Sequence, residues 1–190
     1  MIFTRHDLKC YLSMDKYALG IKRRKPRFIG DDVWKFEITL RYHEYYFNNR
    51  DKSFVHKLLL CWYKYRHYCI GRRLGFDIPI NVFDGGLRIN HTGLIVVNSN
   101  ARIGKYCDVH QGVNIGMQGK SEDDCPIIGD NVWIGPGAKL FGKIKIGSNC
   151  QIGANAVVNR SFEDIGITIA GIPARKVSDH ANPYRREYLL

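Results

Sequence analysis

Two histidines, His91 and His110, are the residues in the middle of this chain best suited to moving a proton. Imidazole titrates close to neutral pH and is a common general base for activating a hydroxyl nucleophile. The plainer interpretation is a hydrogen-bonded structural histidine at His91 and an exposed corner residue at His110. A zinc site made of three histidines is not expected, because residues 77–177 contain only these two, and no metal is predicted.

The two histidines lie within a repeat of six residues. An aliphatic residue recurs at every sixth position, and a small or β-branched residue follows most of them four positions later. The aliphatic set is Val97, Ile103, Val109, Ile115, Ile128, Ile134, Leu140, Ile146, Ile152 and Val158, and the second set is Ala101, Cys107, Val113, Val132, Ala138, Ile144, Cys150 and Ala156. This rhythm predicts a parallel β-helix in which each hexad supplies one short strand and one corner.

Among the aliphatic residues from Ile128 onward, four are directly followed by glycine, at Gly129, Gly135, Gly147 and Gly153. We expect these glycines to permit a positive φ or a close backbone approach at the corners. His91 also falls on the six-residue beat, twelve positions before Ile103. An inward imidazole would be an unusual core residue, so we expect this hexad to be distorted and to aim the ring at a cleft between subunits.

One interruption breaks the rhythm. Ile115 and Ile128 are thirteen residues apart, and residues 117–126 between them are polar and contain a glycine. We predict that this segment leaves the β-helix as a loop and forms a wall of the active site, since loops on a rigid scaffold often carry specificity.

The first 76 residues differ from the rest in charge and pattern. They contain 17 Lys and Arg against 7 Asp and Glu, a net of +10, whereas residues 77–190 contain 12 against 11, a net of +1. Three helices are expected, the first capped by Thr4 or Asp7 and extending to Leu19, the second capped by Asp31 and the third by Ser53.

A basic run separates the first two expected helices. Its cations are Lys22, Arg23, Arg24, Lys25 and Arg27. A solvated loop is one interpretation, and an anionic lipid or a lipid-linked, diphosphate-bearing substrate is the other. Nucleic acid is not expected as a partner, because no nucleic-acid motif accompanies the run.

These patterns divide the chain into a basic helical region (1–76), a β-helix (77–177) and a C-terminal tail (178–190), with the boundary at residues 75–79. Cys107 and Cys150 fall on small-residue positions of the repeat and are expected to be reduced and buried. No apolar run is long enough to span a membrane and the start lacks a signal-peptide pattern, so a cytoplasmic location is predicted, with the inner face of a membrane as the alternative.

The segment from His91 to Gly116 resembles the part of serine acetyltransferases that holds their catalytic histidine. Further resemblance is found in Gly119-Lys-Ser, in residues 128–138 and in the ending Ala170-Gly-Ile-Pro-Ala-Arg175. It covers about residues 77–177 and is specific for hexapeptide-repeat acyltransferases. It implies a mainly β protein with a left-handed parallel β-helix, an exception to the usual crossover handedness. It also implies a homotrimer with active sites between subunits and acetyl-CoA as the donor.

The same resemblance implies roles for individual residues. His91 would be the general base for direct attack, without an acetyl-enzyme. The aspartate that orients this base in the family has no counterpart at the matching place, Phe76, so Asp77 and Asp84 are the candidates. His110, where the family has an aliphatic residue, is a candidate contact for the acceptor or CoA. The positions expected to line CoA are Pro136, Ala154, Asn159, Arg160, Arg175 and Lys176.

The acceptor is the point at which the chain departs from serine acetyltransferases. Their loop after Gly-Lys-Ser carries an Arg-His pair that holds the carboxylate of the amino acid, and the matching places here are Asp124 and Cys125, with Lys120 nearby. An acidic residue there would repel a carboxylate. A sugar hydroxyl of a capsular or cell-surface glycan is therefore the expected acceptor, L-serine is the alternative, and a non-catalytic scaffold is the third hypothesis.

Overall fold

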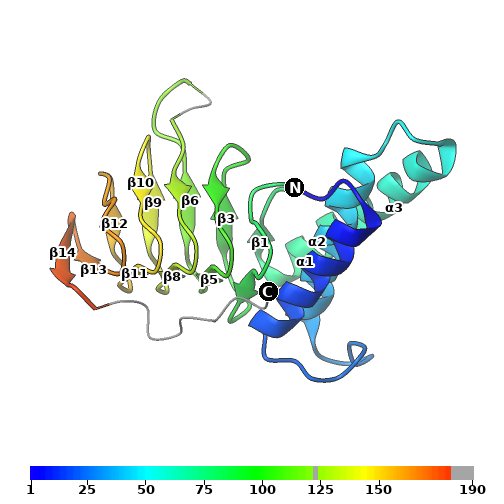
Figure 1. Cartoon of the computed structure of the whole chain (residues 1–190), viewed down its shortest axis with the longest axis horizontal. Helices are drawn as coiled ribbons and strands as arrows, with labels where there is room; N and C mark the ends of the chain where they lie inside the picture. Colours follow the sequence, from blue (N-terminus) through cyan, green and yellow to red (C-terminus); the bar gives the residue numbers. More distant parts are fainter. Residues whose placement is uncertain (122–123, 181–190) are drawn as a thin grey trace.

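A computed structural model of the chain describes residues 1–121 and 124–180. It contains three helices followed by a stack of short strands (Figure 1). The helices are α1 (Arg5–Ala18), α2 (Asp32–Asn48) and α3 (Phe54–Leu74). The strands are β1 (Phe76–Asp77), β2 (Arg88–Ile89), β3 (Ile95–Val97), β4 (Arg102–Ile103), β5 (Asp108–Val109), β6 (Asn114–Gly116), β7 (Ile127–Ile128), β8 (Trp133–Ile134), β9 (Lys139–Phe141), β10 (Lys145–Ile146), β11 (Gln151–Ile152), β12 (Val157–Val158), β13 (Thr168–Gly171) and β14 (Ala174–Ser178).

The strands form three parallel sheets, which are the three faces of the predicted β-helix. The first has the order β1-β3-β6-β9-β12, the second β10-β7-β4, and the third β14-β13-β11-β8-β5-β2. Strands adjacent in a sheet come from successive coils, and β14 turns back to pair antiparallel with β13. The mainly β fold class predicted from the six-residue rhythm is confirmed.

The interior of the β-helix is filled as the repeat predicts. Ile134, Leu140, Ile152 and Val158 are fully buried, as are the small residues Ala138, Cys150 and Ala156. A short fourth-position side chain leaves the central volume to the larger aliphatic residue of its coil. This close-packed column provides a rigid frame for the corners.

The corner glycines act through close approach rather than through a positive φ. A Cβ added to Gly135 would lie 2.7 Å from the backbone oxygen of Ile152 on the next coil. The left-handed backbone conformation is instead adopted by corner asparagines, with φ values of 54° at Asn131, 60° at Asn149 and 55° at Asn155. Asparagine tolerates this conformation better than other side chains do.

The helices begin close to the predicted caps. Thr4 and Asp7 form a capping box at the start of α1, and the Ser53 hydroxyl accepts a hydrogen bond from the backbone N–H of His56 at the start of α3. Asp31 precedes α2, but its side chain makes no cap bond to this helix. Its carboxylate accepts hydrogen bonds from Arg23 and from the backbone N–H of Arg27 instead.

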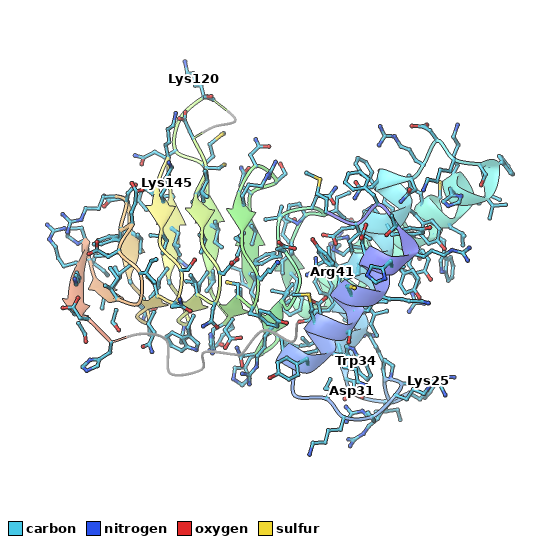
Figure 2. The ribbon with its side chains drawn as sticks, viewed as in Figure 1. Lys25, Asp31, Trp34, Arg41, Lys120 and Lys145 are labelled. Carbon is cyan, nitrogen blue, oxygen red and sulfur yellow. The ribbon has the colours of Figure 1, made fainter. Side chains whose placement is uncertain are left out.

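A buried ionic cluster joins the helices to the first coil (Figure 2). Arg41 of α2 is fully buried, and its Nε donates to Asp15 at 2.7 Å while its Nη1 donates to Glu44 at 3.0 Å. The same guanidinium donates to the backbone oxygens of Phe83 and Asp84, both at 2.8 Å. Asp15 in turn accepts from the backbone N–H groups of residues 86 and 87. The helical region is therefore fixed to the end of the column at β1 and β2.

The predicted loop leaves the β-helix between β6 and β7 and stands away from the column, with Lys120 near its tip (Figure 2). Residues 122–123 of the loop and residues 181–190 of the predicted C-terminal tail lie outside the described residues. Within the described ranges, no helix is both long and apolar enough to cross a membrane.

Candidate active site

His91 lies in a corner that is two residues longer than the equivalent corners of the next coils. Ile89 is in register with Val109, and Val96 is in register with Asn114, so seven positions separate the two pairs in the first coil and five in the second. The third coil repeats the shorter path, since Ile134 and Lys139 are also five apart. The extra length falls on residues 91 and 92 and explains why the His91 side chain is exposed. The expected distortion of this hexad is confirmed.

His110 is on the next coil, beside His91. The two ring centres are 6.4 Å apart, and the His110 ring also packs against Trp133 with 4.7 Å between centres. The Nδ1 of His110 donates a hydrogen bond of 2.9 Å to the backbone oxygen of Ile134, because a carbonyl oxygen can only accept. In the neutral ring this leaves Nε2 as an acceptor.

Burial lowers the pKa of His110 below its ordinary value, and this effect outweighs the bond to Ile134 and the nearby carboxylate of Asp108. His110 therefore remains neutral at physiological pH. Asp108 itself is buried and lies 3.7 Å from the guanidinium of Arg88. Sequence reasoning missed Asp108 and Trp133, although the i, i+2 spacing of Asp108 and His110 is a signal for side chains on one side of an extended segment.

Asn90, next to His91 in the chain, has a side-chain donor that is available to a ligand. The side-chain nitrogen Nδ2 of Asn90 is buried and has no hydrogen-bond partner among the described residues. A buried donor without a partner is uncommon, and a bound molecule is one way of satisfying it. Sequence reasoning also missed Asn90.

The structure does not bring Asp77 or Asp84 to His91. Asp77 is exposed on β1 and borders a cavity of about 530 Å³ together with His43 and His67. Asp84 lies in a different cavity, near Tyr11 and the Arg41 cluster. No hydrogen bond links either carboxylate to His91 in the part of the chain that the structure describes. The orienting role assigned to them stays a prediction.

The residues predicted to line CoA divide between two corners of the column. Pro136 and Ala154 follow β8 and β11 by two positions, as His91 follows β2, so these three share one corner. Asn159 and Arg160 follow β12, at the same corner as Met117, where the loop begins. Arg175 and Lys176 are exposed on β14 at the far end of the stack. A single chain does not bring the whole set together.

The loop residues have different environments. Lys120 is exposed, whereas Cys125 is 4% exposed and burial raises the pKa of its thiol. The carboxylate of Asp124 accepts a hydrogen bond of 3.1 Å from the backbone N–H of Ser121 and helps to hold the loop. Cys125 is therefore part of the loop base, and Lys120 and Asp124 remain the candidates for substrate contact.

The described residues do not form a metal site. Among residues 1–121 and 124–180, no group of three His, Cys, Asp or Glu side chains is placed to hold an ion.

Comparisons with known proteins agree with this architecture. Residues 125–160 match the family model described as bacterial transferase hexapeptide (six repeats). A serine acetyltransferase of Synechococcus elongatus is 41% identical over 93 residues, which are 48% of this chain and 38% of that protein. One of Staphylococcus epidermidis is 38% identical over 133 residues, which are 65% of this chain and 60% of that protein.

The fold itself has a close match among solved structures. The crystal structure of a serine acetyltransferase from Brucella abortus superimposes with a TM-score of 0.74 at 23% identity, covering 94% of this chain and 72% of that one. The match covers 38% of the length of the Synechococcus elongatus protein and 60% of the length of the Staphylococcus epidermidis protein. The chain therefore shares its β-helix fold with the serine acetyltransferases to which it is similar, and its residues 125–160 match the hexapeptide-repeat model.

Proposed function

We propose that this protein is an acetyl-CoA-dependent O-acetyltransferase in which His91 is the general base. The observation that carries the proposal is the two-residue extension of the first corner, which turns His91 outward beside His110. His91 takes the proton of the acceptor hydroxyl as the oxygen attacks the thioester carbonyl. An O–C bond forms, the C–S bond breaks, and the leaving thiolate takes the proton from the His91 imidazolium, giving an acetyl ester and free CoA.

L-serine is the acceptor that the comparisons support best, because the relatives that match the β-helix are serine acetyltransferases. This ranking reverses the expectation from the loop sequence, which favoured a glycan hydroxyl. We propose that Asn90 and His110 bind the acceptor, since the first offers an unpaired donor and the second a free acceptor nitrogen.

A sugar hydroxyl is the second candidate acceptor, favoured by one observation. Asp124 occupies the loop where serine acetyltransferases are expected to hold a carboxylate with basic groups, and it places a negative charge there. A sugar hydroxyl has no carboxylate to repel. Kinetics with both acceptor classes decides between them.

The division of the donor residues supports a homotrimer. Pro136 and Ala154 lie on the corner of His91, whereas Asn159 and Arg160 lie across the face formed by β1-β3-β6-β9-β12. Within one coil, the turn at residues 154–155 and the strand β12 separate the first corner from the second. We propose that CoA binds between the His91 corner of one subunit and the Arg160 corner of a neighbour, with Arg175 and Lys176 near its phosphates.

The basic run between α1 and α2 is a candidate contact for anionic substrates. The side chains of Lys22, Arg24 and Lys25 are exposed, while Arg23 is paired with Asp31. We propose that this loop binds an anionic or diphosphate-bearing acceptor.

The test is release of free thiol from acetyl-CoA by the purified chain, measured with L-serine and with nucleotide-linked and lipid-linked sugars in turn. We expect His91→Ala to lower turnover by about two to four orders of magnitude, as removal of a general base does. The matched control is His6→Ala, because His6 is an exposed histidine on α1. Turnover by His91→Ala equal to that of the control would refute the assignment. Absence of thiol release with every acceptor would favour the scaffold hypothesis.

A further inference from the structure

One side of α3 is apolar and uncovered. The helix packs against α2 through Tyr63 and His67, with Tyr63 stacked on Tyr42 at 4.9 Å and His67 beside Phe36 at 5.1 Å. The large apolar side chains on its other side are more than half exposed: Phe54 (74%), Val55 (60%), Leu58 (54%), Trp62 (54%), Tyr65 (63%) and Tyr68 (60%). We call these six residues the α3 face.

The α3 face is continuous along the helix. At 3.6 residues per turn, Phe54, Leu58, Trp62 and Tyr65 fall within one sector about 80° wide. It runs over most of the helix, which projects at the end of the molecule opposite β14 (Figure 1). An exposed apolar stripe of this size marks an interaction surface.

The charges on α3 identify the kind of partner. The helix carries five basic residues, Lys57, Lys64, Arg66, Arg72 and Arg73, and no acidic residue. By helical geometry, Lys57 and Lys64 border the α3 face on one side and Arg66 borders it on the other, whereas Arg73 is paired with Asp32 of α2 at 3.1 Å. The guanidinium of Arg66 also lies over the ring of Trp62, 5.9 Å from its centre.

A second copy of α3 is a poor match for this surface. Two such helices would bring ten like charges together, with no acidic residue on either to form an ion pair. An aromatic and aliphatic stripe flanked on both sides by Lys and Arg is instead typical of helices that lie in the interface of an anionic bilayer. Tyr and Trp favour the headgroup level, and the long basic side chains reach phosphate groups there.

We propose that the α3 face is a binding surface for an anionic phospholipid membrane, on which α3 lies parallel to the plane of the bilayer. This surface is separate from the His91 corner and from the basic loop at residues 22–27, and the proposal does not depend on acetyl transfer. The basic residues around the face provide electrostatic attraction, and the aromatic residues provide burial in the interface.

The experiment is flotation of the full chain with vesicles of phosphatidylcholine alone or with about 30% phosphatidylglycerol. We expect at least tenfold stronger binding to the anionic vesicles, weakening with salt, because each basic residue near the surface contributes about fivefold. The emission of Trp62 should shift to shorter wavelength on binding, and Trp62→Phe should still bind but lose most of that shift, since Trp34 is buried and Trp133 belongs to the β-helix.

Two double variants, each with a matched control, distinguish binding by the α3 face from nonspecific binding to lipid. Leu58→Glu/Tyr65→Glu should lower binding at least tenfold, while Ile165→Glu/Val177→Glu, at equally exposed apolar positions of the β-helix, should bind like the wild type. Lys64→Glu/Arg66→Glu should also weaken binding, while Lys105→Glu/Lys143→Glu on the β-helix should change it little. Circular dichroism verifies that each variant is folded.

Three results would overturn the proposal. The first is equal binding to neutral and anionic vesicles, or none to either. The second is unchanged binding by Leu58→Glu/Tyr65→Glu, with loss on Arg24→Glu/Lys25→Glu, which would assign the membrane contact to the basic loop. The third is a smaller assembly of Leu58→Glu/Tyr65→Glu than of the wild type in sedimentation without lipid, which would assign the α3 face to a second copy.

Discussion

The rings of His91 and His110 lie side by side on neighbouring coils, with 6.4 Å between their centres and an angle of 52° between their planes. This separation leaves space for one hydroxyl oxygen to hydrogen-bond to both imidazoles. The pair therefore combines an exposed ring with a half-buried ring whose Nδ1 is fixed by the backbone oxygen of Ile134.

His110 should act on acceptor binding rather than on proton transfer. We predict that His110→Phe raises KM for the acceptor about tenfold or more and changes KM for acetyl-CoA little, because Nε2 is lost while the donor residues remain. His110→Gln, which keeps an acceptor group, should recover part of the affinity. Steady-state kinetics with each substrate varied measures both constants, and an equal effect on both substrates would argue against this role.

Asp77 should contribute little to the base. Asp77→Asn is expected to keep kcat/KM within about threefold of the wild type, because Asp77 borders the cavity of His43 and His67 instead of contacting His91. The pH dependence of kcat/KM is the measurement, since loss of an orienting carboxylate would move its acid limb. A loss of tenfold or more together with a shifted limb would restore Asp77 as the partner of His91.

An alanine-to-leucine substitution should affect stability at Ala138 and donor binding at Ala154. Ala138→Leu is expected to lower the free energy of unfolding by about 1–3 kcal/mol, because Ala138 is fully buried and the added atoms overpack the column. Ala154→Leu, at an exposed corner, should leave stability nearly unchanged and raise KM for acetyl-CoA. Urea unfolding and donor kinetics measure the two effects. An unchanged donor KM in Ala154→Leu would remove this residue from the proposed CoA site.

Arg41 should be essential for docking the helices onto the β-helix. We predict that Arg41→Leu lowers the free energy of unfolding by about 3–5 kcal/mol, because it leaves the carboxylates of Asp15 and Glu44 buried without their cation. Arg50→Leu is the control, since the pair of Arg50 with Asp51 is largely exposed and should matter little. Equal unfolding curves for the two variants would contradict the prediction.

The paired imidazoles of His43 and His67 should make the fold sensitive to acid. Their Nδ1 atoms are 2.9 Å apart, and burial lowers the pKa of each to about 4 from an ordinary value near 6.5. The unfolded chain therefore binds more protons than the folded chain between these values, so this contribution to stability falls as pH decreases from about 6.5 towards 4.

The effect is best measured as a difference between proteins. Burial raises the pKa of Glu37 and Glu44, which favours the folded state at lower pH and opposes the histidines. The wild type should lose on the order of 2 kcal/mol more than His43→Gln/His67→Gln between pH 7 and pH 5. Parallel pH profiles of unfolding for the two proteins would show that the pair does not titrate in this range.

The sequence by itself determined the column. The inward positions of Ile134 and Ile152, the small positions of Ala138 and Cys150 and the exit of the loop after Gly116 all follow from local spacing. A six-residue period leaves only one way to bury those side chains, because moving the register by one residue would turn them towards solvent. The start of the strands just after Gly75 follows from the same change of pattern.

Only the tertiary structure decided which groups meet. The pairing of His91 with His110, the separation of Asp77 from both, and the distribution of the donor residues over two corners depend on how the coils stack. The burial of Arg41 depends on the helices docking on the first coil, and the exposure of the α3 face depends on which side of α3 packs against α2. Such contacts join residues far apart in the chain, so no local spacing specifies them.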